Sequence, residues 1–255
     1  MPLMDATLNR MAEEDRLGLY RTVFSRRDVR SQFVDQPIPD DVLGRVLTAA
    51  HHAPSVGLMQ PWNFILLRSP DKRAAVQALF AQANAEAAEL HDGERGTLYR
   101  SLKLEGILES PLNICVTCNH ERTGSPVLGR SHIRETDVYS TVCAVQNLWL
   151  AARTEGLGVG WVSILEPSAL AETLKLPDHV TPIAYLCIGY VSEFLCEPEL
   201  QKAGWEKRLP LSDVVMFEEW NGAEKNSALF DQLQGMQSSF PFECLVQKSS
   251  GDGDA

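Results

Sequence analysis

The chain has 255 residues, of which 44% are hydrophobic and 22% charged, as in ordinary globular proteins that bury a substantial core. Its formal net charge of -11 argues against nonspecific nucleic-acid binding, which needs an electropositive face. No apolar run approaches the roughly 18 residues of a membrane-spanning helix, and the first residues lack a signal-peptide pattern. We therefore expect a cytoplasmic protein with neither a membrane nor a nucleic-acid partner.

The first predicted element is a loosely amphipathic helix over residues 6–25, and the segment that follows it concentrates positive charge. Ser25 to Arg30 contains three arginines and one aspartate in an otherwise acidic protein. Because a planar guanidinium donates two parallel hydrogen bonds, such a segment suits a phosphate. A solvated charge run is the alternative. Asp28 is either a structural tether for Arg27 or Arg30, or a catalytic base beside a bound anion.

A helix capped by Asp40 or Asp41 is predicted to end near His51, and a loop follows over residues 53–62. The loop is rich in Pro, Ser, Gly and Gln, yet it includes Met59 and a tryptophan at its end. Apolar residues in a loop either plug the core or form a wall for a flat ligand, and the sequence leaves both open.

The remaining pattern alternates between strands and helices. Strands are expected over 63–67, 112–118, 159–165 and 181–190, and helices over 71–90, 97–109, 136–152, 167–174 and 214–217. The helix over 136–152 has so broad an apolar face that we expect burial on more than one side, by a partner subunit or in a monomer core. One domain is expected over 1–220, with a weakly ordered tail, polar and rich in Ser and Gly, over 221–255.

Two short motifs have structural explanations. Cys115 and Cys118 have redox or zinc spacing, but in a strand they point to opposite faces and no second pair completes a zinc site, so buried thiols and no metal are predicted. The glycines of 156–160 follow a helix and precede a strand, the reverse of the order a dinucleotide-binding turn needs. Ser163 is expected inside that strand, where its hydroxyl needs a hydrogen-bond partner.

Four segments, in this order, resemble the FMN-dependent nitroreductase family. They are Arg26 to Arg30, Pro54-Ser55 followed by Gln60-Pro61-Trp62, Gly156 to Gly160 after a buried helix, and the basic pair Lys207-Arg208. The resemblance covers roughly residues 20–220. It implies an α+β fold in which helices flank a mostly antiparallel central sheet. It also implies an intertwined homodimer with FMN at each interface.

The same resemblance implies a binding site. The arginines of 26–30 would hold the FMN phosphate and polar edge with help from Arg208, the partner subunit would supply Ser55 and Gln60, and residues 160–163 would face the isoalloxazine. The implied FMN-binding residues are Arg26, Arg27, Asp28, Val29, Arg30, Ser55, Gln60, Leu104, Gly160, Ser163 and Arg208.

Asp28 separates this chain from ordinary members of the family, which usually carry Ser there. The combination of residues 26–30 with residues 53–64, 100–106 and 160–163 resembles a branch that consumes its flavin. That branch converts reduced FMN and O2 to 5,6-dimethylbenzimidazole, the lower ligand of cobalamin, and releases erythrose 4-phosphate. Asp28 is then implied as the base and Ser163 as a hydrogen-bond donor near the flavin.

Further expectations accompany this reading. Residues 100–106 would form a lid that excludes water and nicotinamide, and a separate flavin reductase would supply FMNH2. Two alternatives remain at this point: an NAD(P)H-dependent nitroreductase that retains its FMN, and a noncatalytic FMN-binding protein.

Overall fold

The computed structural model describes residues 9–124, 126–222, 228–229 and 231–232. The chain divides into two units, 1–194 and 195–255, and each is described by itself. The second unit contains a short helix α7 (Glu199–Lys202) and the turn η2 (Leu211–Asp213). The predicted tail over 221–255 lies almost entirely outside the described residues.

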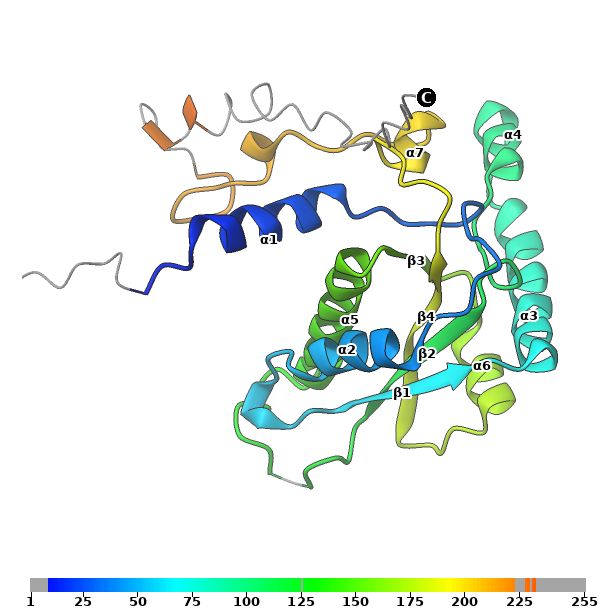
Figure 1. Cartoon of the computed structure of the whole chain (residues 1–255), viewed down its shortest axis with the longest axis horizontal. Helices are drawn as coiled ribbons and strands as arrows, with labels where there is room; N and C mark the ends of the chain where they lie inside the picture. The colour runs from blue at the N-terminus through cyan, green and yellow to red at the C-terminus, as the bar shows by residue number, and fades with distance from the viewer. Residues whose placement is uncertain (1–8, 125, 223–227, 230, 233–255) are drawn as a thin grey trace, which may run out of the picture. The chain divides into compact units, whose positions relative to one another are not determined.

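The first unit is built on a four-stranded sheet whose strand order is β1-β2-β4-β3 (Figure 1). The strands are β1 (Trp62–Leu67), β2 (Leu112–Asn119), β3 (Leu157–Val162) and β4 (Val180–Tyr190). All three pairings are antiparallel, and one register shift interrupts the β2–β4 pair after Val116. The prediction of an α+β fold with an antiparallel sheet is confirmed.

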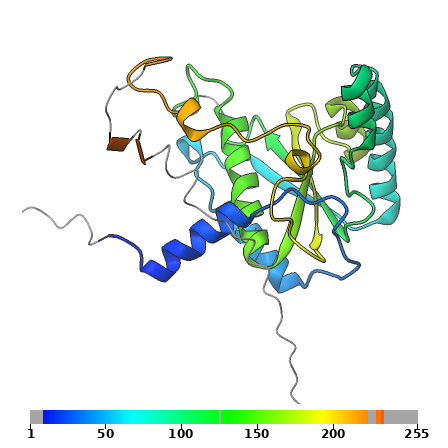
Figure 2. The ribbon, with the colours of Figure 1, turned by 90° about the horizontal axis from the view of Figure 1, so that it is seen from above.

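Two layers of helix cover the sheet, and Figures 1 and 2 both place α5 and α3 on opposite sides of it. One core joins α2 (Asp40–His51) and α5 (Thr136–Thr154) to β2 residues such as Ile114. The other joins α3 (Pro70–Ala88) and α6 (Pro167–Leu174) to the opposite face of the sheet, which includes Cys115. Successive strand residues face opposite sides, so neighbouring residues of β2 serve different cores.

Helix α5 is buried along much of its length, as its broad apolar face predicts. Within a single chain, however, Tyr139 and Val142 are 56% and 38% exposed. The expectation that a partner subunit also packs against α5 therefore stays a prediction. None of the helices in the described part of the chain combines the length and apolarity needed to cross a membrane.

Four predicted boundaries are wrong. Helix α1 begins only at Glu13 and ends at Ser25, and none of its side chains is buried. The helix expected over 97–109 is α4 (Gly93–Ser101). After α4 the chain extends, and Gly106 then lies against the segment 26–30, where a Cβ would lie only 2.6 Å from the carbonyl oxygen of Arg30.

The other two errors lie farther along the chain. Strand β3 ends at Val162, so Ser163 lies just beyond it. No helix forms over 214–217, where η2 is followed by turns and Glu218 adopts a φ of 64°, outside the helical region.

Candidate active site

The arginine-rich segment lies against the edge strand of the sheet. The amide of Val29 donates to the carbonyl oxygen of Val159 over 3.0 Å, and Asp28 forms a parallel bridge with Val159. The segment comes close to β3 because Gly160 has no side chain: a Cβ there would lie 2.1 Å from the Val29 oxygen. Gly160 therefore has a structural reason to be glycine, and its predicted contact with the isoalloxazine stays a prediction.

Both carboxylate oxygens of Asp28 have partners. Oδ1 accepts a hydrogen bond from the backbone N–H of Trp161 over 2.9 Å, and Oδ2 accepts one from Nη2 of Arg30 over 2.7 Å. The structure thus pairs Asp28 with Arg30, one of the two tethers that the sequence left open. The side chain keeps 30% of its surface exposed. Asp28 therefore binds Arg30 while part of its carboxylate stays accessible.

The environment of Asp28 makes its carboxylate more basic than an ordinary one. Burial raises its pKa above 3.8, against the opposing effects of the Arg30 guanidinium, the Trp161 N–H and Arg26. A buried carboxyl with a raised pKa and specific charged partners is a typical feature of functional sites. The Asp28 carboxylate can therefore hold a negative charge beside Arg30. It can also accept a proton, although protonation weakens its ion pair with Arg30.

Helix α5 positions the same segment from the other side. The Arg26 guanidinium carbon lies 4.9 Å from the centroid of the Trp149 ring, and Trp149 Nε1 donates to the carbonyl oxygen of Arg27 over 3.3 Å. Nη1 of Arg27 donates to the carbonyl oxygens of Phe24 and Arg26. The three guanidinium groups thus belong to one segment that two elements hold in place. Their role as phosphate ligands stays a prediction.

The predicted lid segment, residues 100–106, docks on this site through Gly106 and the Arg30 carbonyl. Glu105, which is buried, accepts the N–H of Ile107 over 2.6 Å and pairs with Lys103 over 2.7 Å. Leu104 packs partly buried against the core beneath α3, and Val29 is buried as well. Beyond the end of α4 at Ser101, the segment is therefore held by the Lys103–Glu105 pair and the Ile107 hydrogen bond rather than by helical hydrogen bonds.

The loop over 53–62 forms a strained turn around the short helix η1 (Val56–Leu58). Gly57, Leu58 and Gln60 have φ values of 58°, 52° and 46°. Left-handed conformations at non-glycine residues are costly and cluster at functional sites. The hydroxyl oxygen of Ser55 closes the turn by accepting the N–H of Gln60 over 3.1 Å.

Two apolar residues of this loop, Met59 and Trp62, point inward, whereas Leu58 is 76% exposed. Met59 is 3% exposed and Trp62 is 4% exposed, and the Trp62 Nε1–H donates to Nδ1 of His51. Of the two readings that the sequence left open, a core plug is correct for these side chains. The assignment of Ser55 and Gln60 to a partner's flavin stays a prediction.

Two further predicted residues lie apart from the segment 26–30 in the chain. Ser163 is exposed and follows β3 directly, two residues beyond the amide that binds Asp28. Arg208 belongs to the second unit, where its backbone N–H donates to Oε1 of Gln201 over 3.4 Å. Their roles toward FMN stay predictions.

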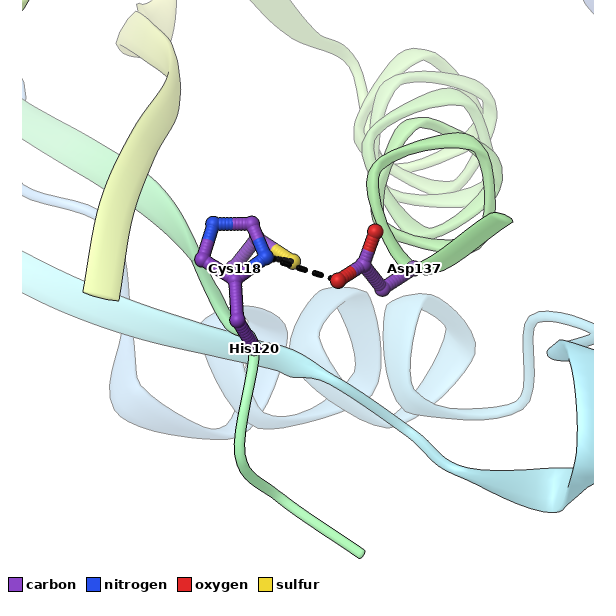
Figure 3. A group of neighbouring side chains, drawn as sticks. All are labelled: Cys118, His120 and Asp137. Carbon is purple, nitrogen blue, oxygen red and sulfur yellow. Dashed lines mark hydrogen bonds and ion pairs between the residues drawn. The ribbon is translucent and has the colours of Figure 1, made fainter. Parts of the chain in front are cut away.

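The sequence reasoning missed one cluster, which joins the end of β2 to the first turn of α5 (Figure 3). Ligand atoms of Cys118, His120 and Asp137 lie within 4.8 Å of one another. Nδ1 of His120 is 2.7 Å from Oδ2 of Asp137 and 3.8 Å from the Cys118 sulfur, while Nε2 contacts Thr181 Oγ1 over 3.0 Å. No spacing in the sequence signals this group, because β2 and α5 meet only in the folded chain.

The cluster fits a buried ion pair better than a metal centre. The carboxylate oxygen that binds His120 is also paired with the guanidinium of Arg130, so the atoms a metal would need are already in use. Burial raises the pKa of the Cys118 thiol to about 11, so this sulfur is a neutral thiol beside the Asp137 carboxylate in the metal-free cluster.

Comparison with known proteins identifies the family. Residues 23–190 match the model of the nitroreductase family. The chain is 43% identical to a 5,6-dimethylbenzimidazole synthase of Rhodospirillum rubrum over 185 residues, which cover 72% of this chain and 87% of that protein.

Two solved structures share the fold. A BluB-like flavoprotein of Clostridium difficile 630 is 19% identical, with a TM-score of 0.59 over 79% of this chain and 99% of that one. An iodotyrosine deiodinase bound to FMN and 3-iodo-L-tyrosine is 18% identical, with a TM-score of 0.62 over 79% of this chain and all of that one. The matched region runs from the end of α1 to the end of β4 and contains the sheet, α5 and the arginine-rich segment, and the chain is therefore a member of the nitroreductase family.

Proposed function

We propose that this protein makes 5,6-dimethylbenzimidazole, the lower ligand of cobalamin, by O2-dependent fragmentation of reduced FMN, with erythrose 4-phosphate as the second product. The observation that carries the proposal is the carboxylate of Asp28, fixed by the Trp161 amide and Arg30 within the arginine-rich segment. The 43% identity to a relative named for this synthesis supports it.

The described residues fit reduced FMN as a substrate. Arg26, Arg27 and Arg30 lie on one segment and offer guanidinium groups of the kind that bind phosphate. The fold is shared with an iodotyrosine deiodinase whose structure contains FMN. When bound, reduced FMN supplies the electrons that O2 accepts. The other contributions come from the chain, and we assign flavin contacts also to Val29, Leu104, Gly160 and Arg208.

Asp28 is proposed as the base. Breaking the ribityl chain away from the ring begins with removal of a proton at the carbon attached to the ring, and a carboxylate does this better than a serine hydroxyl. Its raised pKa increases the affinity of Asp28 for that proton. The Trp161 N–H holds Oδ1 in a fixed orientation, and Arg30 keeps the group ionised until the proton arrives.

Other residues orient the substrate and exclude water in this proposal. Ser163 donates a hydrogen bond near the flavin, and Ser55 and Gln60 reach it from the partner subunit of a homodimer. The segment 100–106, held by the Lys103–Glu105 pair, covers the site. A separate reductase supplies FMNH2, and the protein acts in the cytoplasm.

The experiment supplies purified protein with FMNH2 in air and follows 5,6-dimethylbenzimidazole by chromatography. Wild-type protein should form it, and Asp28→Asn should bind FMN but form no product. Full product formation by Asp28→Asn would remove Asp28 from its role. No product from wild-type protein under any condition that loads FMNH2 would defeat the proposal as a whole.

Membership of the nitroreductase family by itself favours a second candidate, an NAD(P)H-dependent nitroreductase that keeps its FMN. Repeated oxidation of NAD(P)H with a nitroaromatic acceptor, with the flavin spectrum unchanged afterwards, would favour that activity. Tight FMN binding with no turnover under any reductant would indicate a flavin-sequestering protein instead.

A further inference from the structure

We propose that Arg130 is a positioning residue for the Ser55–Gln60 turn, acting through the loop that contains it. The inference deepens the proposed function, in which this turn contacts FMN. It is carried by a contact between two loops that lie far apart in the sequence, and by the way Arg130 holds one of them.

The two loops meet through a pair of glycines. A Cβ on Gly57 would lie 2.5 Å from the carbonyl oxygen of Leu128, and a Cβ on Gly129 would lie 2.7 Å from Cγ1 of Val56. Both glycines have positive φ values, 58° and 83°. The two loops therefore pack closely against each other, and a side chain on either glycine would prevent this packing. A shift of Leu128 and Gly129 would therefore remove or alter the surface against which the turn at Gly57 packs.

Arg130 fixes the second loop from within. Its Nε donates to the carbonyl oxygen of Arg134 over 2.7 Å, its Nη1 to that of His120 over 3.0 Å, and its Nη2 pairs with Asp137. Residues of this loop, among them Arg130 and Arg134, line an open cavity of about 600 Å³. The three bonds of the Arg130 guanidinium join both ends of the loop to α5 and so help to hold its shape.

The first turns of α5 anchor both loops. Asp137, 1% exposed, binds Arg130, and one turn later the hydroxyl of Ser140 accepts the N–H of Val56 over 3.2 Å. The turn at 55–60 thus has two supports from the same helix, one direct and one through Arg130 and the glycine pair. The left-handed Leu58 and Gln60 need such external support, because their conformations are unfavourable by themselves.

The test measures the dissociation constant for oxidised FMN by flavin fluorescence, a readout that needs no turnover. Arg130→Lys keeps the charge but loses the planar fork, and we expect about tenfold weaker binding because the turn is displaced. Arg134→Lys is the matched control: that residue lines the same cavity and gives Arg130 only its backbone carbonyl, which the substitution keeps. It should bind FMN as wild type does.

A double-mutant cycle separates positioning from general destabilisation. If Arg130 acts through the turn, then adding Arg130→Lys to a variant without either proposed flavin contact of the turn, Ser55→Ala with Gln60→Ala, should weaken binding less than twofold further. Effects that multiply would overturn the inference. Gly129→Ala disturbs the same contact between the loops without changing Arg130. If Arg130→Lys does not fold, FMN binding by Gly129→Ala tests the inference instead.

Failure of the inference is distinct from failure of the proposed function. If wild-type protein binds FMN and the folded Arg130→Lys or Gly129→Ala protein binds it equally well, only the positioning role is lost. If wild-type protein does not bind FMN at all, the proposed function fails and this inference fails with it.

Discussion

The carbonyl oxygen of Val29 occupies the place that a side chain on Gly160 would need, 2.1 Å from an ideal Cβ. The absence of a side chain at position 160 permits the close approach of the arginine-rich segment to β3, where the Val29 amide binds the Val159 carbonyl. It also brings Asp28 close enough for its Oδ1 to accept the N–H of Trp161. Position 160 therefore governs the geometry of the proposed base, although it carries no functional group.

Gly160→Ala should displace the segment 26–30 from the sheet edge. A backbone oxygen cannot move as a flexible side chain can, so we expect a loss of about 1–3 kcal/mol in the free energy of unfolding and strongly weakened FMN binding. Urea denaturation and FMN titration measure the two effects. Gly44→Ala on α2, where nothing lies within 4 Å, is the control and should stabilise slightly. Equal behaviour of the two variants would contradict the prediction.

Asp28→Asn should inactivate the enzyme. It should also gain stability relative to wild type as the pH rises from acid to neutral. The folded-state pKa of Asp28 is raised, so the folded protein binds the proton more tightly than the unfolded chain does. Stability then falls as pH rises from about 3.8 through the folded-state pKa, because ionising the half-buried carboxyl costs free energy. A neutral Asn lacks this cost.

Urea denaturation of wild type and Asp28→Asn between pH 3.5 and pH 7 checks this prediction. The difference between their unfolding free energies should move in favour of Asp28→Asn as pH rises. The effects of other carboxylates largely cancel in that difference. A trend in the opposite direction would mean that Arg30 outweighs burial at this site.

Glu105→Gln should loosen the segment 102–107. The buried Glu105 carboxylate accepts the Ile107 amide and pairs with Lys103, and loss of its charge should cost about 1–3 kcal/mol. Hydrogen exchange of the Ile107 amide should accelerate accordingly. Glu109→Gln is the control, because its pair with Lys103 is exposed and such pairs contribute about 1 kcal/mol or less.

Among Cys115, Cys118, Cys143 and Cys187, native-state alkylation at pH 8 should modify Cys143 first. Burial raises the pKa of Cys118 to about 11 and those of Cys115 and Cys187 to about 12, so their thiolate populations are negligible. Cys143 is only partly buried. Mass spectrometry of peptides after brief alkylation reads the order directly, and early labelling of Cys118 would show that β2 opens at its end.

Much of the fold follows from local patterns. All four predicted strands form, although β3 spans 157–162 instead of 159–165, and α5 has the predicted buried face, because hydrophobic periodicity reports which side of an element meets the core. Helix ends were less predictable. The helix expected to reach Glu109 ends at Ser101, and the extended chain beyond it brings Gly106 against Arg30, a contact between residues far apart in sequence.

The residue types of the candidate site were readable from the linear chain, since three arginines around one aspartate and the Pro-Ser turn are local features. Their partners were not. The sequence could not distinguish Arg27 from Arg30 as the tether of Asp28. Nor could it foresee the Trp161 amide on Asp28, or the meeting of Arg130 with the buried Asp137. Those contacts depend on which backbones approach most closely, and only the packing of β3, α5 and the loops between them decides that.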